Sequence, residues 1–172
     1  MTRSLDDQTM PGPLSLFFAA DHRRLDALLR QATYKPGRIA LGPFGEFRAG
    51  LLKHIGMEEK ILFPIARHKG ADSRLFARLR VDHGAIASLL VPTPTPEIVG
   101  QILSVLSLHN RREEEPKGAY EICDEAAGPA EAELLLASLS AFPEVKLKDY
   151  RDGPAVFRHI EVNLDLSRRQ WL

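Results

Sequence analysis

The sequence predicts an all-α protein: an up-down-up-down antiparallel four-helix bundle with a C-terminal extension. Proline and glycine residues divide the chain up to Cys123 into four segments that are rich in helix-forming residues. Each segment carries a stripe of mainly apolar side chains spaced three and four residues apart, which is the period of an amphipathic helix. The breaks between the segments are short, and short connections make consecutive helices antiparallel neighbours.

Capping residues and breaks set the limits of the four predicted helices. Asp72 or Ser73 can cap the third helix. Thr95 followed by Pro96 is a typical helix start, because a capping side chain precedes a proline at the first helical position. The predicted helices cover about residues 14–31, 44–67, 72–91 and 95–123. Pro116 should distort the fourth helix soon after Glu113, because proline lacks the backbone donor that continues a helix.

The sequence after the fourth predicted helix no longer follows this pattern. Gly128 and Pro129 should end a helix, and residues 131–141 are compatible with another short one. Residues 155–171 could form a further helix lying across the bundle. The expected domains are a bundle at residues 12–125 and a partly helical C-terminal extension, packed on the bundle, at residues 126–172.

An internal repeat relates the first helix to the third and the second helix to the fourth. The first and third share an Asp-His pair followed by apolar residues at matched positions, at residues 21–22 and 82–83. The second and fourth share the pattern His-x-x-x-Glu-Glu, at residues 54–59 and 109–114. The bundle is therefore predicted to consist of two related helical hairpins, each of which presents one histidine and then a His-x-x-x-Glu pair.

The polar residues on the apolar stripes are the candidate functional residues. Residues i and i+4 of a helix project from one face, so each His-x-x-x-Glu pair can direct two donor atoms at one point. The repeat would bring four imidazoles and two carboxylates to the middle of the interior, as in helical bundles that hold pairs of metal ions. This donor set suits iron, manganese or zinc, and the lack of thiolate ligands disfavours copper(I) and iron–sulfur clusters. The predicted metal ligands are His22, His54, Glu58, His83, His109 and Glu113.

A single histidine on an apolar stripe is more often a hydrogen-bonded core residue than a metal ligand. Four histidines would all fall by chance on stripes that occupy about 3 of 7 positions roughly once in 30, so the set of four favours ligands. Two buried carboxylates without partners would cost several kcal/mol each, and a bound cation removes that cost. Without the cation, two carboxylates so close together should raise the pKa of at least one of them.

The neighbours of the candidate ligands are predicted to have lesser roles. Glu59 and Glu114 lie one step off the stripes and are expected to be solvated, with a hydrogen bond to an imidazole as the alternative. Asp21 and Asp82 are expected to be exposed helix residues. Tyr120 could either line an access route to the site or pack in the core.

Composition and charge exclude several classes of function. The 23 Lys and Arg residues balance 23 Asp and Glu residues, so the chain lacks the excess positive charge that nucleic-acid binding requires. No apolar run approaches the roughly 20 residues that span a bilayer, and Asp6 and Asp7 interrupt the segment where a signal peptide would be apolar. The single cysteine fits a reducing cytosol. These observations predict a cytoplasmic protein that binds neither nucleic acid nor a membrane, and they leave its oligomeric state open.

Taken in order, the motifs around the candidate ligands resemble those of a known family. The motifs are His22, then His54-Ile-Gly-Met-Glu58-Glu59 followed by Ile-Leu-Phe-Pro64, then Asp82-His83, then His109-Asn-Arg-Arg-Glu113-Glu114. Over about residues 12–123 they resemble the hemerythrin-like domain, also called the HHE cation-binding domain. The resemblance implies a non-haem di-iron centre in a four-helix bundle, with two iron ions bridged by the two His-x-x-x-Glu carboxylates. Zinc, nickel or manganese could take the place of iron.

The resemblance also implies a small diatomic ligand at the metal. Oxygen carriers of this family add a histidine one turn before the third-helix ligand, where this chain has Leu79. Four histidines and two bridging carboxylates would leave each iron with open positions for water, oxygen or nitric oxide, and a dedicated reversible oxygen carrier is disfavoured. The predicted function is a hemerythrin-like di-iron protein that binds, senses or handles oxygen, nitric oxide or iron.

Two other functions are compatible with the same residues. One is a di-iron redox enzyme or a protein that repairs iron–sulfur clusters. The other is a structural role, in which a single zinc or iron ion stabilises the bundle. The sequence leaves open whether the protein is an enzyme, and metal stoichiometry separates the structural role from the others.

We predict that His54→Ala and His109→Ala each weaken metal binding by at least about tenfold, because each removes a proposed ligand and even the loss of an outer hydrogen-bond partner has effects of that size. His68→Ala and His159→Ala, at histidines off the stripes, are the controls and should change the affinity little. A Zn²⁺ titration against a competing chelator measures the four affinities. Equal metal retention in all four variants would contradict the ligand assignment.

Overall fold

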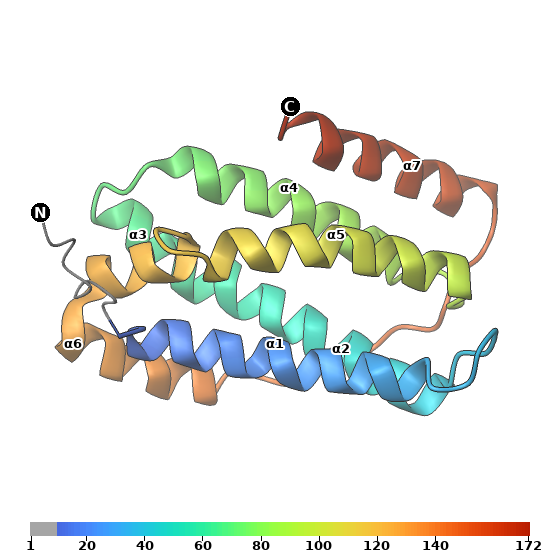
Figure 1. Ribbon diagram of the computed structural model, residues 1–172, viewed down its shortest axis with the longest axis horizontal. Coiled ribbons are helices and arrows are strands. Elements are labelled where there is room, and N and C mark those ends of the chain that lie inside the picture. The colour runs from blue at the N-terminus through green and yellow to red at the C-terminus, as the bar shows by residue number, and fades with distance from the viewer. Residues whose placement is uncertain (1–9) are drawn as a thin grey trace, which may run out of the picture.

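The computed structural model describes residues 10–172, and all regular secondary structure within these residues is helical (Figure 1). This confirms the all-α class for the described part of the chain; Asp6 and Asp7 lie outside it. The helices are α1 (Pro13–Ala32), α2 (Leu41–Met57), α3 (Phe63–His68), α4 (Ser73–Leu89), α5 (Pro96–Glu114), α6 (Ala119–Ser140) and α7 (Pro154–Arg169), and a π-helical turn, η1 (Glu58–Leu62), joins α2 to α3.

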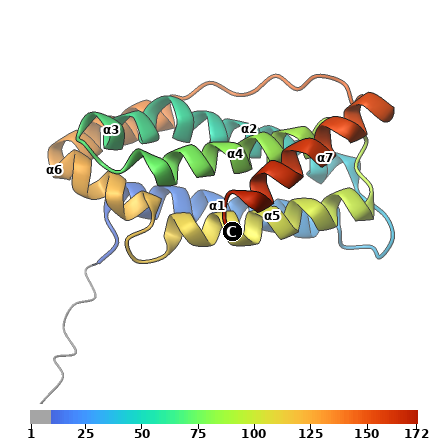
Figure 2. The same ribbon diagram turned by 90° about the horizontal axis from the view of Figure 1, so that it is seen from above.

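Successive long helices run in opposite directions along the molecule. In Figure 1, α1 runs from left to right, α2 continues through η1 and α3 back to the left, α4 runs to the right and α5 returns. Helix α6 turns back at Gly128, whose backbone is not helical (φ 70°), and Pro129 begins its second part. An extended linker at residues 142–152 then runs along the molecule to α7, which lies along α4 (Figure 2).

The predicted helix starts are confirmed at two caps. Asp72 Oδ1 accepts a hydrogen bond from the Arg74 amide at 2.9 Å, and Thr95 Oγ1 accepts one from the Ile98 amide at 3.3 Å. Both side chains satisfy an amide that the first turn of a helix leaves without a partner. These caps fix where α4 and α5 begin, and therefore the height of their histidines in the bundle.

The second predicted helix contains a wider turn that its periodicity did not indicate. The Phe63 amide bonds to the Glu58 carbonyl, five residues back, and this defines η1. Pro64 follows directly and has no amide hydrogen for the ordinary helical bond, which accounts for a local departure from the α-helix. Such single π-turns are frequent at functional sites, and this one begins at a candidate ligand.

The fourth predicted helix ends earlier than expected, at Glu114 and not near Cys123. Pro116 stops it, and a turn through Lys117 (φ 64°) and Gly118 starts α6. A Cβ atom on Gly118 would lie 2.6–2.7 Å from three backbone oxygens, so the close approach to the end of α5 requires glycine. The turn therefore brings α6, with Cys123, back against α1 and α3.

Two apolar clusters fill the core, and the candidate ligands lie between them. On α1, His22 separates Phe18 of one cluster from Leu25 of the other. On α4, His83 separates Leu79 and Ile86 in the same way. The polar residues thus form a layer with a dry core on both sides. The cluster toward the loop between α1 and α2 is centred on Leu25, Phe47, Ile86, Ile102 and Leu164, and the other on Phe18, Phe63, Phe76, Leu79 and Tyr120.

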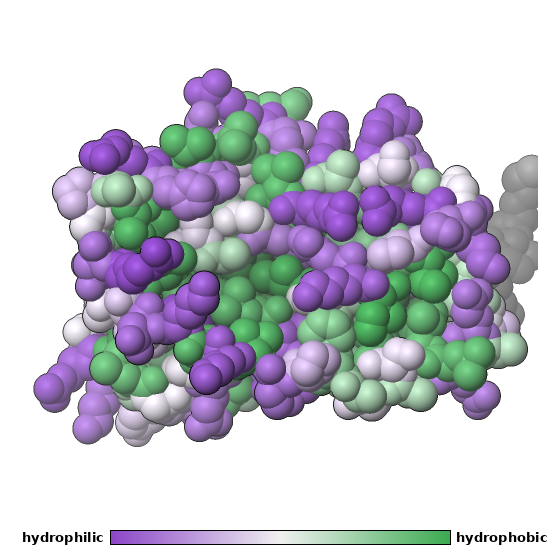
Figure 3. All heavy atoms as spheres, turned by 180° about the vertical axis from the view of Figure 1, so that it is seen from behind, coloured by the Kyte–Doolittle hydropathy of each residue, from purple (hydrophilic) through white to green (hydrophobic). Residues whose placement is uncertain are grey.

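The outer surface mixes polar and apolar side chains. Figure 3 shows the face opposite to that of Figure 1, where polar groups are interspersed with apolar ones. Within residues 10–172, none of the helices combines the length and the apolar character that crossing a bilayer demands.

Candidate metal centre

The structure brings the six predicted ligands together in the interior. They come from α1, α2, η1, α4 and α5, and each is at most 8% exposed. They form two groups in which one ligand atom per residue lies within 4.8 Å of all the others. Glu58 and Glu113 belong to both groups. The first group is His22, His54, Glu58 and Glu113, and the second is Glu58, His83, His109 and Glu113.

The Nε2 atoms of the four histidines point toward the shared glutamates. In the two i,i+4 pairs, His54 Nε2 lies 3.3 Å from Glu58 Oε1 and His109 Nε2 lies 3.0 Å from Glu113 Oε1. His83 Nε2 lies 3.1 Å from both Glu58 Oε2 and His109 Nε2. The expected geometry of the His-x-x-x-Glu pairs is therefore present, and the donors converge from all sides of the interior.

A second ring of carboxylates holds the outward nitrogens of these histidines. Each acid is the chain neighbour of a different candidate ligand, so the repeat extends to this ring. An Nδ1 proton donated to a carboxylate fixes the ring orientation and leaves Nε2 free toward the centre. The Nδ1–oxygen distances are 2.5 Å for His22 with Glu114, 2.8 Å for His54 with Asp21, 2.8 Å for His83 with Glu59 and 3.4 Å for His109 with Asp82.

Two sequence predictions about these acids are wrong, and two are refined. Asp82 is 1% exposed and Asp21 is half-buried, although both were expected to be exposed. Glu59 and Glu114 keep contact with solvent but take the alternative role of imidazole partner. A residue beside a stripe points at the neighbouring helix, and here that helix supplies an imidazole. The repeated Asp-His and Glu-Glu pairs were the sequence feature that could have indicated this.

The hydroxyl group of Tyr120, on α6, lies among the first group of candidate ligands. Its hydroxyl lies 2.6 Å from Glu58 Oε1 and 3.1 Å from Glu113 Oε2. It also lies 3.1 Å from His22 Nε2 and 3.3 Å from His54 Nε2, and the side chain is 1% exposed. Sequence reasoning missed this contact, because the turn that returns Tyr120 to the bundle has no periodic pattern.

The residues present fit a metal ion. Glu58 Oε2 and Glu113 Oε1 are buried and have no hydrogen-bond partner. The nearest imidazole nitrogens lie 3.1 Å from Glu58 Oε2 and 3.0 Å from Glu113 Oε1. Unpaired oxygens of buried carboxylates are costly, and a cation between them and the Nε2 lone pairs would satisfy both sets of atoms. Imidazole and carboxylate donors suit iron, manganese or zinc.

Without a cation, the imidazoles themselves supply the positive charge. Burial disfavours the charged form of His54 and His109, but the adjacent carboxylates raise the pKa of each to about 10. Burial likewise opposes ionisation of Glu58, but His54 and His83 hold its pKa well below the usual value. The pKa of Glu58 therefore moves opposite to the rise that was expected of at least one of the two carboxyls, because protonated imidazoles replace the missing cation.

Other residues singled out in the sequence do not join the cluster. His68 and His159 are exposed. Leu79, at the position of the carriers' additional histidine, is fully buried among apolar side chains. Cys123 is buried with its Sγ 3.8 Å from the Leu62 carbonyl.

Over residues 10–172, helices bring six imidazole and carboxylate groups together, and these define a protein whose interior could hold metal ions. The family described as the hemerythrin HHE cation binding domain matches residues 16–116, more than half of the chain. The protein belongs to this family, which confirms the resemblance of its motifs. Comparison with curated proteins and with solved structures gives no match.

We predict that the stability gap between metal-loaded and metal-free protein widens as pH rises from about 5 to 9. In the metal-free state, the raised pKa values of His54 and His109 give stability that is fully present below 6.5 and is lost as pH rises toward about 10. Metal binding instead strengthens as the competing protons leave. Thermal unfolding of both forms measures the gap, and a gap that narrows with rising pH would contradict the arrangement of charges.

We predict that Tyr120→Phe lowers the unfolding free energy of the metal-free protein by about 1–3 kcal/mol, because Glu58 loses a buried donor. The phenylalanine ring would keep the stacking on Phe18, at 5.0 Å between ring centroids. Tyr150→Phe, at a half-buried ring under Arg48, is the control and should change stability by less than about 0.5 kcal/mol. Urea unfolding measures both, and equal effects would argue against the role of the Tyr120 hydroxyl.

Proposed function

We propose that this protein is a hemerythrin-like non-haem di-iron protein that binds, senses or handles oxygen, nitric oxide or iron. One observation carries the proposal: two groups of four ligands share the same two glutamates, so two cations could lie side by side with common carboxylates. The fully buried position of both glutamates supports a cation charge at this point. Membership of a cation-binding family is consistent with the same assignment.

The proposal includes the architecture around the centre. We propose that α1, α2 with η1 and α3, α4, and α5 form the up-down-up-down bundle of a metal-binding domain at residues 12–125. The alternating directions of these helices support this (Figure 1). Residues 126–172 would then be a C-terminal extension, made of the second part of α6, the linker and α7.

In this proposal the two halves of the repeat would each hold one cation. His22 and His54 would bind one ion, His83 and His109 the other, and Glu58 and Glu113 would bridge them. When bound, iron would supply open coordination positions for a small molecule and a redox-active centre. The chain's own contribution is to aim the Nε2 atoms inward through the outer carboxylates and to exclude water with the two apolar clusters.

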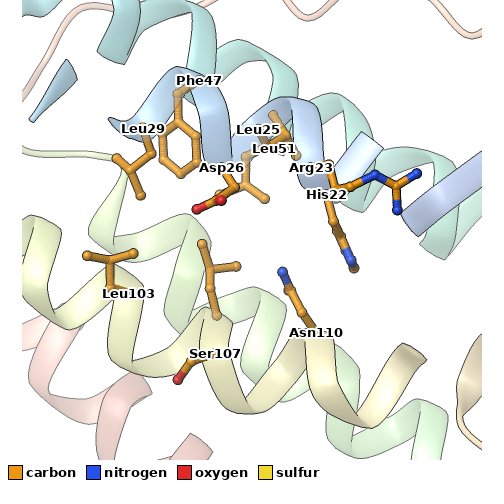
Figure 4. A pocket seen from close by; sticks show the side chains of 11 residues that line it. His22, Arg23, Leu25, Asp26, Leu29, Phe47, Leu51, Leu103, Ser107 and Asn110 are labelled. Atoms are coloured by element: carbon orange, nitrogen blue, oxygen red, sulfur yellow. The ribbon is translucent and has the colours of Figure 1, made fainter. Parts of the chain in front are cut away.

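A cavity supports access of a small uncharged molecule to one side of the centre. It lies between α1, α2 and α5, has a volume of about 300 Å³, and has His22 and Asn110 facing each other at one end (Figure 4). The Asn110 Oδ1 atom is buried without a partner. Arg23, Asp26 and Ser107 also line the cavity, but apolar side chains form most of its wall: Leu25, Leu29, Phe47, Leu51, Leu103 and Leu106.

The size of this cavity favours a second candidate function, a di-iron redox enzyme. A diatomic molecule needs little more room than a water molecule, which takes up about 30 Å³ in the liquid. Small-molecule sites begin at about 300 Å³, the size of this cavity. A small organic substrate with an apolar body and one hydrogen-bonding group would match the leucine walls and the polar end at Asn110.

We predict that protein loaded with iron under anaerobic conditions and then desalted retains two ions per chain, because both ligand groups are complete. Its absorption spectrum should change on exposure to oxygen or nitric oxide, since the ligands leave positions open at each ion. Metal analysis and spectra of the same samples test this, with a His54→Ala/His109→Ala variant as the control. A single retained ion in well-loaded protein would contradict a di-iron centre and favour the structural role.

A further inference from the structure

We propose that α7 positions one half of this metal centre. Ser167, Gln170 and Trp171, at the end of α7, hold Asp82 in the orientation in which it supports His109. This inference rests on the proposed metal centre. It assigns a role to a segment beyond residues 16–116, the part of the chain that matches the family.

Asp82 is a buried carboxylate, and residues at the end of α7 donate hydrogen bonds to both of its oxygens. Its Oδ1 accepts hydrogen bonds from Ser167 Oγ at 2.6 Å, Gln170 Nε2 at 2.8 Å and Trp171 Nε1 at 3.2 Å. Its Oδ2 accepts a hydrogen bond from Trp171 Nε1, also at 3.2 Å, and faces His109 Nδ1 at 3.4 Å. Three donors from one helix therefore fix the rotation of the carboxylate, and that rotation sets the direction of the oxygen that faces the imidazole.

The indole of Trp171 also holds a cation close to the same carboxylate. The Arg112 guanidinium carbon lies 3.5 Å from the ring centroid, and Arg112 Nη1 lies 3.6 Å from Asp82 Oδ2. Gln170 Nε2 donates a second hydrogen bond, at 2.9 Å, to the Arg78 carbonyl on α4. The end of α7 thus ties α4 and α5 together around Asp82.

Apolar packing fixes the place of α7 itself. Ile160 and Leu164, each 4% exposed, join the core cluster that also contains Leu25 and Ile86. They lie along the helix before the three donors, and Figure 2 shows α7 running along α4 to the C-terminus. The donors therefore reach Asp82 from a helix whose position the core sets.

The other half of the repeat has no equivalent support from a separate helix in the described contacts. Asp21, the counterpart of Asp82, bonds His54 and is held by Arg24 of its own helix at 2.7 Å. The Asp21 side chain is 15% exposed, against 1% for Asp82. The C-terminal helix therefore makes the two halves unequal, and its loss should act on the His83–His109 half alone.

The test is a comparison of Zn²⁺ affinity in two backgrounds that each retain one half of the centre. His22→Ala leaves the His83–His109 half, and His83→Ala leaves the His22–His54 half. The variant Ser167→Ala/Gln170→Leu/Trp171→Phe removes all three donors and keeps apolar bulk. We expect it to weaken Zn²⁺ binding by about tenfold in the His22→Ala background, the lower end of the range for outer partners of a ligand, and by less than about twofold in the His83→Ala background.

Two controls separate positioning from general destabilisation. Asp165→Ala breaks an exposed pair with Arg169 on α7 without touching Asp82, and it should change neither affinity. Trp171→Phe alone removes one donor and keeps a ring beside Arg112. It replaces the triple variant in the titrations if the triple variant does not fold. It should weaken Zn²⁺ binding in the His22→Ala background only. Circular dichroism establishes folding of each variant before the titrations.

Equal weakening in both backgrounds, or no weakening in either, would overturn the role of α7. The parent protein distinguishes this failure from a failure of the proposed function. If it binds two Zn²⁺ ions and the α7 variants have no selective effect, only the role of α7 is wrong. If it binds fewer than two, the dinuclear centre itself is wrong.

Discussion

The complete burial of Glu58 and Glu113 is the constraint on which the rest of this structure depends. Both carboxylates are 0% exposed and share one small volume in the middle of the molecule. Two negative charges in such a place are stable only if positive charge surrounds them. The surrounding imidazoles meet this need, either through the protonated rings of His54 and His109 or as partners of a cation. The polar groups nearby contact these imidazoles and carboxylates, and so help to balance the charge of the two glutamates.

The outer carboxylates add a further layer of charge around the histidines. Each histidine turns Nδ1 outward to an acid and Nε2 inward to the glutamates, so the charge alternates from the centre to the surface. The acids are neighbours in the chain of other ligands, as Glu59 is of Glu58. The same Asp-His and Glu-Glu pairs therefore occur in both halves of the repeat. One residue of each pair is a candidate ligand, and the other is the hydrogen-bond partner of a histidine on another helix.

The repeat is nevertheless broken by segments that lie outside the region matching the family. Tyr120, from α6, contacts the His22–His54 half, while α7 reaches Asp82 behind the His83–His109 half. Both segments follow α5 in the chain and pack on opposite sides of the centre. Tyr120 and the end of α7 therefore give the two groups of candidate ligands different surroundings.

Local pattern in the sequence determined a large part of this protein. The period of the apolar stripes and the caps at Asp72 and Thr95 located the helices, and the spacing of His-x-x-x-Glu placed the six converging residues on inner faces. These features depend on one helix at a time, because a helix fixes which residues share a face. The motif order was also sufficient to identify the HHE family.

Tertiary structure alone decided how the centre is supported. The contacts of Tyr120 with Glu58 and of Trp171 with Asp82 join residues far apart in the chain. Their geometry depends on the turn at Gly118 and on where the end of α7 docks, and the spacing of apolar residues predicts neither of these contacts. Burial of Asp82, the low pKa of Glu58 and the π-turn after Met57 arise in the same way. A helix determines which way its own side chains point, but only packing determines what they meet.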